Sequence, residues 1–301
     1  MSKRIIVTGA SGGVGLSTCQ LLVEKGHRVA GAMRSTGGKN EAVAETLRGI
    51  GVELIELDVT DQGSVDTGIE QAIEALGGLD VVFNNAGVLT FGLQETLRAE
   101  EMHQVFDVNV FGVQRVMRAV LPHFRAQRSG LVLYTSSLIG RVAINFYATY
   151  CASKWALEAL ADAYRAELSG FGIESCIVEP GPMPTAFIGG NMLRPTDVEA
   201  GRAYGPLAEA LEPSLAGLEA AMESNPRQRP RMVAEAVAEL LEMPFGRKPF
   251  RTTVDHMGLG DQIAPYNAQL HQVTHAIYSA FGNQGLLELN AEPGDSATAA
   301  G

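Results

Sequence analysis

The segment Thr8-Gly9-Ala10-Ser11-Gly12-Gly13-Val14-Gly15 decides the fold of this chain. A short apolar run, residues 4–8, leads into it, and an amphipathic helical pattern, residues 14–25, follows it directly. At a glycine-rich turn between a strand and a helix, free N–H groups and the positive end of the helix dipole bind phosphate, and missing Cβ atoms let a pyrophosphate approach. Such a turn can also be a packing solution. Its place after the first strand favours a nucleotide site.

Beyond this turn, β-branched runs alternate with helix-length segments. Because strands separated by helices return only through crossover connections, the alternation predicts a parallel sheet with both faces covered. The expected strands are residues 4–8, 28–33, 52–57, 79–83, 131–135, 173–178 and 250–254. The expected helices are residues 14–25, 62–76, roughly 99–128, 148–168, 231–241 and 261–281. The predicted fold class is α/β, a doubly wound Rossmann sheet forming a single domain over residues 1–285.

Glycine and proline interrupt the pattern between residues 187 and 230, the one long irregular stretch that we expect. Long irregular segments in compact domains are often lids or binding loops, so we predict a helical lid over the substrate. Plain packing is the alternative explanation for the apolar residues in it. Residues 286–301 are predicted to be a flexible tail.

Composition excludes several classes of function. The 301 residues carry 23 Lys plus Arg against 34 Asp plus Glu, a net charge of −11, so neither nucleic acid nor an acidic membrane surface is an expected partner. Cys19, Cys151 and Cys176 form no metal-binding pattern, and the six histidines are scattered, so no metal site is expected. With no signal peptide or membrane span predicted, we expect a cytoplasmic protein.

The spacing of the glycines is TGxxxGxG, which resembles the cofactor turn of the classical short-chain dehydrogenases/reductases. Tyr150 and Lys154 strengthen the resemblance: they lie four residues apart on a predicted helix, so their side chains share a face. Ser137 lies thirteen residues upstream at the end of a strand, and Asn109 lies on the preceding helix. Ser136 is the alternative hydroxyl, although the spacing favours Ser137.

The chemistry explains this set of residues. Hydride transfer to a ketone leaves an alkoxide that needs a proton, and a phenol with a pKa near 10 is a poor base at neutral pH unless a neighbouring cation stabilises its anion. The resemblance implies that Tyr150 exchanges the proton and that Lys154 lowers its pKa and holds the ribose. It also implies that Ser137 orients the substrate oxygen and that Asn109 maintains a water relay.

The resemblance further implies a cofactor cleft along the carboxyl ends of the strands. Asp58 would meet the adenine, or alternatively cap the next helix, and Thr185 would meet the carboxamide. The implied cofactor-binding residues are Gly9, Ser11, Gly13, Val14, Gly15, Arg34, Asp58, Val59, Asn85, Ala86, Gly87, Tyr150, Lys154, Pro180, Gly181, Met183 and Thr185.

The end of the second strand indicates which cofactor is bound. It reads Ala32-Met33-Arg34-Ser35, with an arginine where NAD-binding proteins carry an acid for the ribose. A guanidinium grips a 2′-phosphate with two hydrogen bonds, and Ser11 could add a hydroxyl donor, so NADP(H) is preferred over NAD(H). A solvated cation at position 34 is the alternative.

The predicted function is NADP(H)-dependent interconversion of a ketone or aldehyde and an alcohol. The run from Gly181 to Phe187 loosely resembles the 17β-hydroxysteroid and retinol dehydrogenases and indicates a hydrophobic small-molecule substrate. By resemblance, residues 99–128 and 148–168 would form a homodimer or homotetramer. The alternatives are an NADP(H)-sensing regulatory protein that binds a partner and a sugar epimerase or dehydratase.

Overall fold

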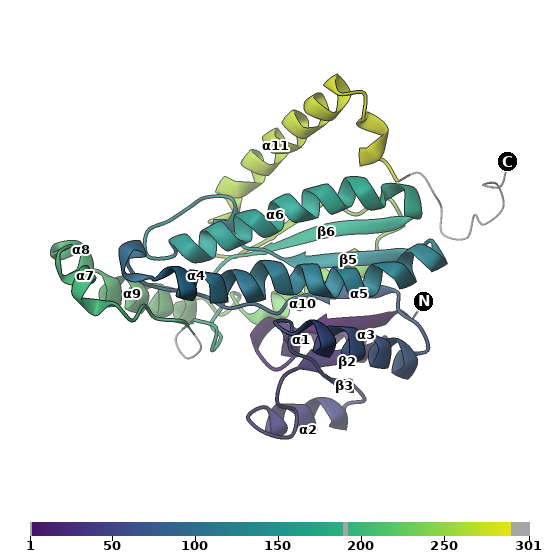
Figure 1. The fold of residues 1–301 in the computed structure, drawn as a ribbon, viewed down its shortest axis with the longest axis horizontal. Coiled ribbons are helices and arrows are strands. Elements are labelled where there is room, and N and C mark those ends of the chain that lie inside the picture. Colours follow the sequence, from purple (N-terminus) through teal and green to yellow (C-terminus); the bar gives the residue numbers. More distant parts are fainter. Residues whose placement is uncertain (1, 189–191, 290–301) are drawn as a thin grey trace.

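The computed structural model describes residues 2–188 and 192–289 (Figure 1). Its sheet has seven strands in the order β3-β2-β1-β4-β5-β6-β7, and each neighbouring pair is parallel. The strands are β1 (Arg4–Thr8), β2 (Arg28–Met33), β3 (Glu53–Glu56), β4 (Val81–Asn84), β5 (Gly130–Thr135), β6 (Ile173–Pro180) and β7 (Arg251–Val254). The predicted Rossmann sheet is confirmed. Its strand order reverses between β1 and β4, where open α/β sheets bind ligands at the carboxyl ends.

Two layers of helices cover the sheet. On one face lie α1 (Gly13–Glu24), α2 (Glu41–Gly49) and α10 (Pro230–Glu242), and on the other lie α3 (Gln62–Leu76), α5 (Gly112–Gln127) and α6 (Ala148–Leu168). Each layer shares an apolar core with the sheet. Because both faces are covered, the inner strands are apolar throughout, and every residue of β6 is buried.

Two helical details differ from the sequence prediction. The sequence pattern did not indicate α2, which glycines flank on both sides. The expected helix over residues 99–128 is three elements: α4 (Ala99–Phe106), a π-turn (Asp107–Phe111) and α5. Single π-turns inside helices are frequent at functional sites, and Asn109 lies in this one.

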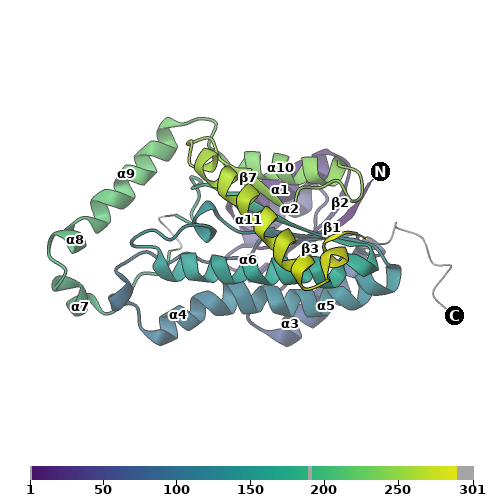
Figure 2. The ribbon, with the colours of Figure 1, turned by 90° about the horizontal axis from the view of Figure 1, so that it is seen from above.

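The segment after β6 is more regular than predicted. It contains α7 (Val198–Arg202), α8 (Pro206–Glu209) and α9 (Leu211–Ser224), which lie beyond the carboxyl ends of the strands (Figures 1 and 2). Backbone hydrogen bonds dock this segment on the loop after β4: Leu193 donates to Leu89 O at 2.8 Å, and Phe91 donates to Leu193 O at 3.2 Å. Residues 189–191 of the predicted lid lie outside the described residues.

The C-terminal part comprises β7, α11 (Gly260–Ala280), which in Figure 2 crosses over α6, and a short 3₁₀ helix (Gln284–Leu287). Of the predicted tail, Leu287 is buried in this short helix, whereas Leu286 and Glu288 are exposed. Residues 290–301 of that prediction lie outside the described part of the chain. The remaining 3₁₀ turns are Gln94–Thr96, Leu138–Gly140 and Ser169–Phe171. Among the described residues, none of the helices combines the length and apolar character needed to cross a membrane.

Candidate functional site

The glycine-rich turn between β1 and α1 is pressed against two other loops. Gly9 has a φ of +68°, and a Cβ there would stand 2.8 Å from the Ala86 Cα. A Cβ on Gly15 would collide with the Gly9 carbonyl oxygen, and one on Gly13 would lie 2.9 Å from Thr185 Cγ2. The turn therefore requires glycine at these positions.

Side-chain hydrogen bonds lock the loop after β4 to the end of β1. Thr8 Oγ1 accepts the backbone N–H groups of Asn85 and Ala86, both at 3.0 Å. The Asn85 amide returns a hydrogen bond to Thr8 O at 2.9 Å. The Asn-Ala-Gly segment is thereby held beside the glycine turn at the switch point of the sheet.

Arg34 and Asp58, two predicted cofactor residues that follow β2 and β3, face each other at this edge. Arg34 Nη1 lies 3.6 Å from Asp58 Oδ2, and the arginine side chain is largely exposed. Burial alone would raise the pKa of Asp58, but hydrogen bonds from Thr60 and the charge of Arg34 bring it below its usual value. The alternative that Asp58 caps the next helix is wrong: Asp61 does so, accepting Ser64 N–H at 2.6 Å.

A carboxylate that the sequence analysis did not single out lies beside Arg34. The carboxylate of Glu56 accepts the backbone N–H groups of Ser35 at 2.6 Å and Thr36 at 2.8 Å, together with the Thr36 hydroxyl at 2.6 Å. Hydrogen bonds from Thr36 lower the pKa of Glu56. Three donors after β2 thus converge on an oxyanion, which in this structure is a carboxylate of the protein itself.

Tyr150, Lys154 and Ser137 are brought together beside the carboxyl end of β5. Lys154 Nζ lies 5.6 Å from the centre of the Tyr150 ring and donates to Thr135 O at 2.8 Å. Ser137 lies close enough to the Tyr150 hydroxyl to oppose the rise of its pKa, and its Oγ donates to Pro180 O at 3.5 Å. The loop can approach α6 because position 140 is glycine, where a Cβ would lie 3.1 Å from Lys154 Cβ. Ser136, the alternative hydroxyl, is buried, and its Oγ has no hydrogen-bond partner.

Burial perturbs both titratable groups. It raises the pKa of Tyr150 far above the ordinary value, opposed by the hydrogen bond with Ser137. Burial also lowers the pKa of Lys154 to about 8, and the charge of Glu158 opposes that shift. Without a further positive charge, Tyr150 is therefore a neutral phenol at pH 7 and can donate its proton. Tyr147, the other tyrosine close in sequence, also has a raised pKa, about 12, mainly through burial.

Asn109 is buried in the π-turn and hydrogen-bonded on both sides. Its Oδ1 accepts Val88 N–H at 2.8 Å, and its Nδ2 donates to Val88 O at 2.9 Å and to Ser153 Oγ at 3.0 Å. A Cβ on Gly87 would lie 3.3 Å from Asn109 Oδ1 and 3.7 Å from Lys154 Nζ. Asn109 thus fixes the loop after β4 next to the ammonium of Lys154.

Gln228 and Asp255, which the sequence analysis missed, contact the Pro-Gly segment after β6. Gln228 is fully buried and donates to Pro182 O at 2.7 Å, while its Oε1 accepts His256 N–H at 2.7 Å. A Cβ on Gly181 would collide with the Asp255 carboxylate. The polar stretch around Gln228 gives no periodic signal, so nothing in the sequence pointed to it. Met183, predicted to meet the cofactor, has its side chain in the core.

Tyr150 belongs to an apolar cluster of buried side chains. The ring of Phe187 lies 6.0 Å from that of Tyr150, and Phe91 lies 4.9 Å from Tyr147. Leu215 of α9 is buried in the same cluster, so the segment after β6 reaches over the tyrosine. The other members are Leu89, Leu93, Phe146 and Cys151, with Ile139, Ile188, Met192, Ala208, Leu211 and Leu218 packed against them.

Among the residues that the structure describes, no group of three or more His, Cys, Asp or Glu side chains is placed to hold a metal ion. The rings of His271 and His275 stack edge to face at 4.4 Å on α11 without a third ligand. All three cysteines are buried and free.

Comparisons with known proteins agree with this geometry. A family model described as short chain dehydrogenase matches residues 3–192. The 3-ketodihydrosphingosine reductase of Bacteroides thetaiotaomicron is 37% identical over 183 residues, which are 61% of this chain and 65% of that protein. Human retinol dehydrogenase 8 is 35% identical over 193 residues, 62% of this chain and 61% of that protein. The matches thus span just under two thirds of the length of these two relatives.

Solved structures resemble most of the chain. A short-chain dehydrogenase from Streptomyces avermitilis superposes with a TM-score of 0.73 at 28% identity, covering 94% of this chain and 98% of that one. An alcohol dehydrogenase from Thermococcus sibiricus, complexed with 5-hydroxy-NADP, gives 0.64 at 27% identity, covering 83% and 95%. The family match, the sheet order and these likenesses agree: the chain belongs to the short-chain dehydrogenase/reductase family of NAD(P)-dependent oxidoreductases.

Proposed function

We propose that this protein interconverts a ketone or aldehyde and the corresponding alcohol on a hydrophobic substrate, with NADP(H) as the preferred cofactor. The observation that carries the proposal is the convergence of Ser137, Tyr150 and Lys154 under an apolar cover, beside a glycine turn that a Cβ would block. A binding protein without catalysis has no need of the hydrogen-bonded serine and tyrosine.

The residues present fit a dinucleotide. The glycine turn and the start of α1 would hold the pyrophosphate, with Ser11, Val14 and the loop around Asn85 beside it. Val59 and Asp58 would border the adenine, and Pro180, Gly181 and Thr185 the nicotinamide. When bound, the cofactor supplies or accepts a hydride at its nicotinamide ring.

In the proposed mechanism, Ser137 and Tyr150 hydrogen-bond the substrate oxygen. During reduction, the phenol of Tyr150 donates its proton as negative charge develops on that oxygen. During oxidation, Tyr150 must act as a base, and the Lys154 ammonium stabilises the tyrosinate. The raised pKa of Tyr150 makes this electrostatic help necessary, because burial alone favours the neutral phenol.

The proton on Tyr150 must be replaced from outside a buried site. Asn109 Oδ1 and Lys154 Nζ both lie within 4 Å of the same point above Gly87. We propose that a water between them connects the ammonium to solvent, with Asn109 and the Val88 backbone holding it in place.

The proposed cofactor preference depends on Arg34, whose guanidinium is largely exposed and would meet a 2′-phosphate although it lies 3.6 Å from the Asp58 carboxylate. Glu56 opposes this preference, because its charge already occupies the donors of Ser35 and Thr36. We propose that Arg34 prevails and that NADPH displaces the Glu56 carboxylate from at least part of this turn.

The substrate is proposed to enter the apolar cluster around Phe91, Phe146, Phe187 and Leu215, under residues 187–230 acting as a lid. Two relatives carry names of reactions on long hydrophobic molecules, which supports this class of substrate. We further propose a homodimer or homotetramer through the helices α4, α5 and α6.

The test is a panel assay that follows nicotinamide absorbance with NADPH and NADP⁺ against long-chain ketones, ring ketones, aldehydes and their alcohols. Turnover that increases with the apolar character of the substrate supports the proposal. Tight NADPH binding with no turnover across the panel would instead favour a cofactor-sensing regulatory protein.

A further inference from the structure

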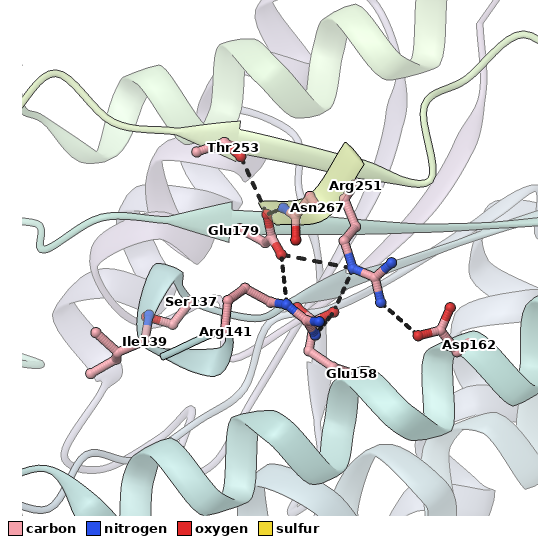
Figure 3. Close-up of polar contacts among 9 residues, drawn as sticks. All are labelled: Ser137, Ile139, Arg141, Glu158, Asp162, Glu179, Arg251, Thr253 and Asn267. Carbon is pink, nitrogen blue, oxygen red and sulfur yellow. Dashed lines mark hydrogen bonds and ion pairs between the residues drawn. The ribbon is translucent and has the colours of Figure 1, made fainter. Parts of the chain in front are cut away.

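Behind the candidate site lies a buried network of charged side chains (Figure 3). Glu158 of α6 accepts hydrogen bonds from Arg251 Nε at 2.8 Å and from Arg141 Nη1 at 3.2 Å, both on its Oε2. Glu179 of β6 lies with its Oε1 3.8 Å from Arg251 Nε and 4.0 Å from Arg141 Nε. Asp162 accepts from Arg251 Nη2 at 2.6 Å.

Two members of the network lie on segments that also carry candidate catalytic residues. Arg141 follows Ser137 by four residues, and Glu158 follows Lys154 by four residues on the same helix. Figure 3 shows Arg141 and Arg251 reaching toward Glu158 from opposite directions, with Ser137 on the loop just before Arg141. The network therefore ties the serine loop and the catalytic helix to β7.

The position of Glu158 relative to Lys154 is the decisive feature. Side chains four residues apart on a helix are about 6 Å apart, and both residues are almost completely inaccessible. A charge on Glu158 raises the pKa of Lys154, which burial lowers to about 8. The centre of the Tyr150 ring lies 5.6 Å from the same ammonium.

The two arginines explain why a carboxylate is stable in so dry a place. Arg141 and Arg251 supply two positive charges against the three acids Glu158, Asp162 and Glu179. Glu179 accounts for the surplus: burial and the charge of Glu158 raise its pKa to about 7, so it is partly protonated at neutral pH. Glu158 has both arginines as partners, which offsets the cost of burying its carboxylate.

We propose that Glu158 is a positioning residue for catalysis: its carboxylate, anchored by Arg141 and Arg251, keeps the Lys154 ammonium charged and aimed at Tyr150. This inference rests on the proposed function of Tyr150 and Lys154. Under this proposal, β7 and the turn at Arg141 contribute to catalysis indirectly, because their arginines hold the Glu158 carboxylate in place.

The consequence appears in the coupled titration of Tyr150 and Lys154. The pair can lose one proton in two ways. Loss from Tyr150 gives tyrosinate beside ammonium, the form that can act as a base on the alcohol. Loss from Lys154 gives a neutral phenol beside a neutral amine, which cannot. Removing the negative charge of Glu158 makes the Lys154 ammonium a stronger acid than in the wild type. The pair then loses a proton at lower pH, and a larger share of that loss comes from Lys154. Oxidation of the alcohol should then slow even where the pair is deprotonated.

The first test measures Lys154 directly by NMR titration of ¹³C-labelled lysine in the protein without cofactor, with Lys154→Met used to assign its signal among the five lysines. Glu158→Gln should lower the pKa of Lys154 by roughly one to three units. Glu179→Gln is the matched control, because it also removes one acid from the network and leaves two acids facing two arginines. The control should leave the Lys154 titration in place.

The second test is the pH profile of kcat for alcohol oxidation in the same variants. Glu158→Gln should move the midpoint to lower pH and reduce the plateau about tenfold or more, since each unit of pKa is a tenfold change in the tyrosinate fraction. Glu158→Asp, which keeps the charge, should restore the midpoint. An unchanged Lys154 titration in Glu158→Gln, or equal shifts in Glu158→Gln and Glu179→Gln, would overturn the proposal. Absence of turnover in the wild type would contradict the proposed function alone, because the NMR result does not depend on it.

Discussion

Lys154 Nζ lies 5.6 Å from the centre of the Tyr150 ring, and both side chains are buried on one face of α6, about one helical turn apart. The ammonium acts on the phenol through its charge, while one of its three N–H groups donates to Thr135 O at 2.8 Å. The arrangement leaves the Tyr150 hydroxyl for Ser137 and the substrate oxygen.

Replacing Tyr150 with phenylalanine should remove the proton donor and lower kcat about 10² to 10⁴-fold in the panel assay. NADPH affinity should change little, because the ring and Lys154 remain. Tyr164→Phe is the matched control: it also loses a hydroxyl from α6, one that donates to Gln114 far from the site. Equal turnover in wild type and Tyr150→Phe would show that another group transfers the proton.

Reversing the charge at Arg34 should change cofactor preference. Arg34→Asp should weaken NADPH binding about ten- to a hundredfold, because a charge-assisted grip on the 2′-phosphate becomes a repulsion. NADH binding should be unchanged or tighter. Fluorescence titration with both cofactors measures this, with Arg48→Asp, an exposed charge reversal on α2, as the control. If both variants lose NADPH affinity equally, the loss reflects the change in net charge of the protein, and a specific contact of Arg34 with the 2′-phosphate is contradicted.

Removing the charge of Glu56 should have the opposite effect. Glu56→Gln should tighten NADPH binding several-fold and leave NADH binding nearly unchanged, because a carboxylate no longer competes for Ser35 and Thr36. The difference should shrink as salt is added, since the site is exposed. If the variant instead weakens both cofactors equally, Glu56 serves only to order the turn after β2.

Much of the fold was predictable from local patterns. The ranges of β1, β2 and α3 match the expected residues, because buried strands and capped helices carry strong periodic signals. The segment that holds α7, α8 and α9 was predicted to be irregular, because Pro206 and Pro213 were expected to interrupt helices. In the structure each proline lies near the start of a helix, where proline is tolerated. The π-turn at Asn109 leaves no mark in the pattern, because its neighbours are apolar on both sides.

The candidate site divides in the same way. Ser137, Tyr150 and Lys154 could be foreseen because a helix fixes the spacing of two of them and a strand end fixes the third. Glu56, Glu158 and Gln228 could not, because their partners lie 20 or more residues away or on another element, and a lone acid or amide in sequence reads as a surface residue. Such long-range polar contacts appear only when the chain is folded.

The glycine turn can be tested with two neighbouring positions. Gly15→Ala should abolish cofactor binding or destabilise the protein, because its Cβ would collide with the Gly9 carbonyl oxygen. Gly12→Ala should be tolerated, since nothing lies within 4 Å of its Cβ. Calorimetric titration with NADPH, together with thermal unfolding, separates the two effects. Equal affinity in the two variants would show that the backbone shifts freely and that the close approach is unimportant.

Glu179 should make the stability of the protein depend on pH. Burial, with the charge of Glu158, raises its pKa from 4.5 in the unfolded chain to about 7 in the fold, so the fold favours the protonated form. This contribution to stability is fully present below pH 4.5 and is lost as the pH rises through 7, a change of up to about 3 kcal/mol.

Glutamine at position 179 resembles the protonated carboxyl and cannot ionise. Relative to wild type, Glu179→Gln should therefore gain free energy of unfolding between pH 5 and pH 8, measured by urea denaturation at each pH. Glu53→Gln, an exposed change on β3, is the control and should show no such trend. A constant difference between Glu179→Gln and wild type across this range would mean that Glu179 is ionised throughout, and that the arginines, rather than protonation, balance its charge.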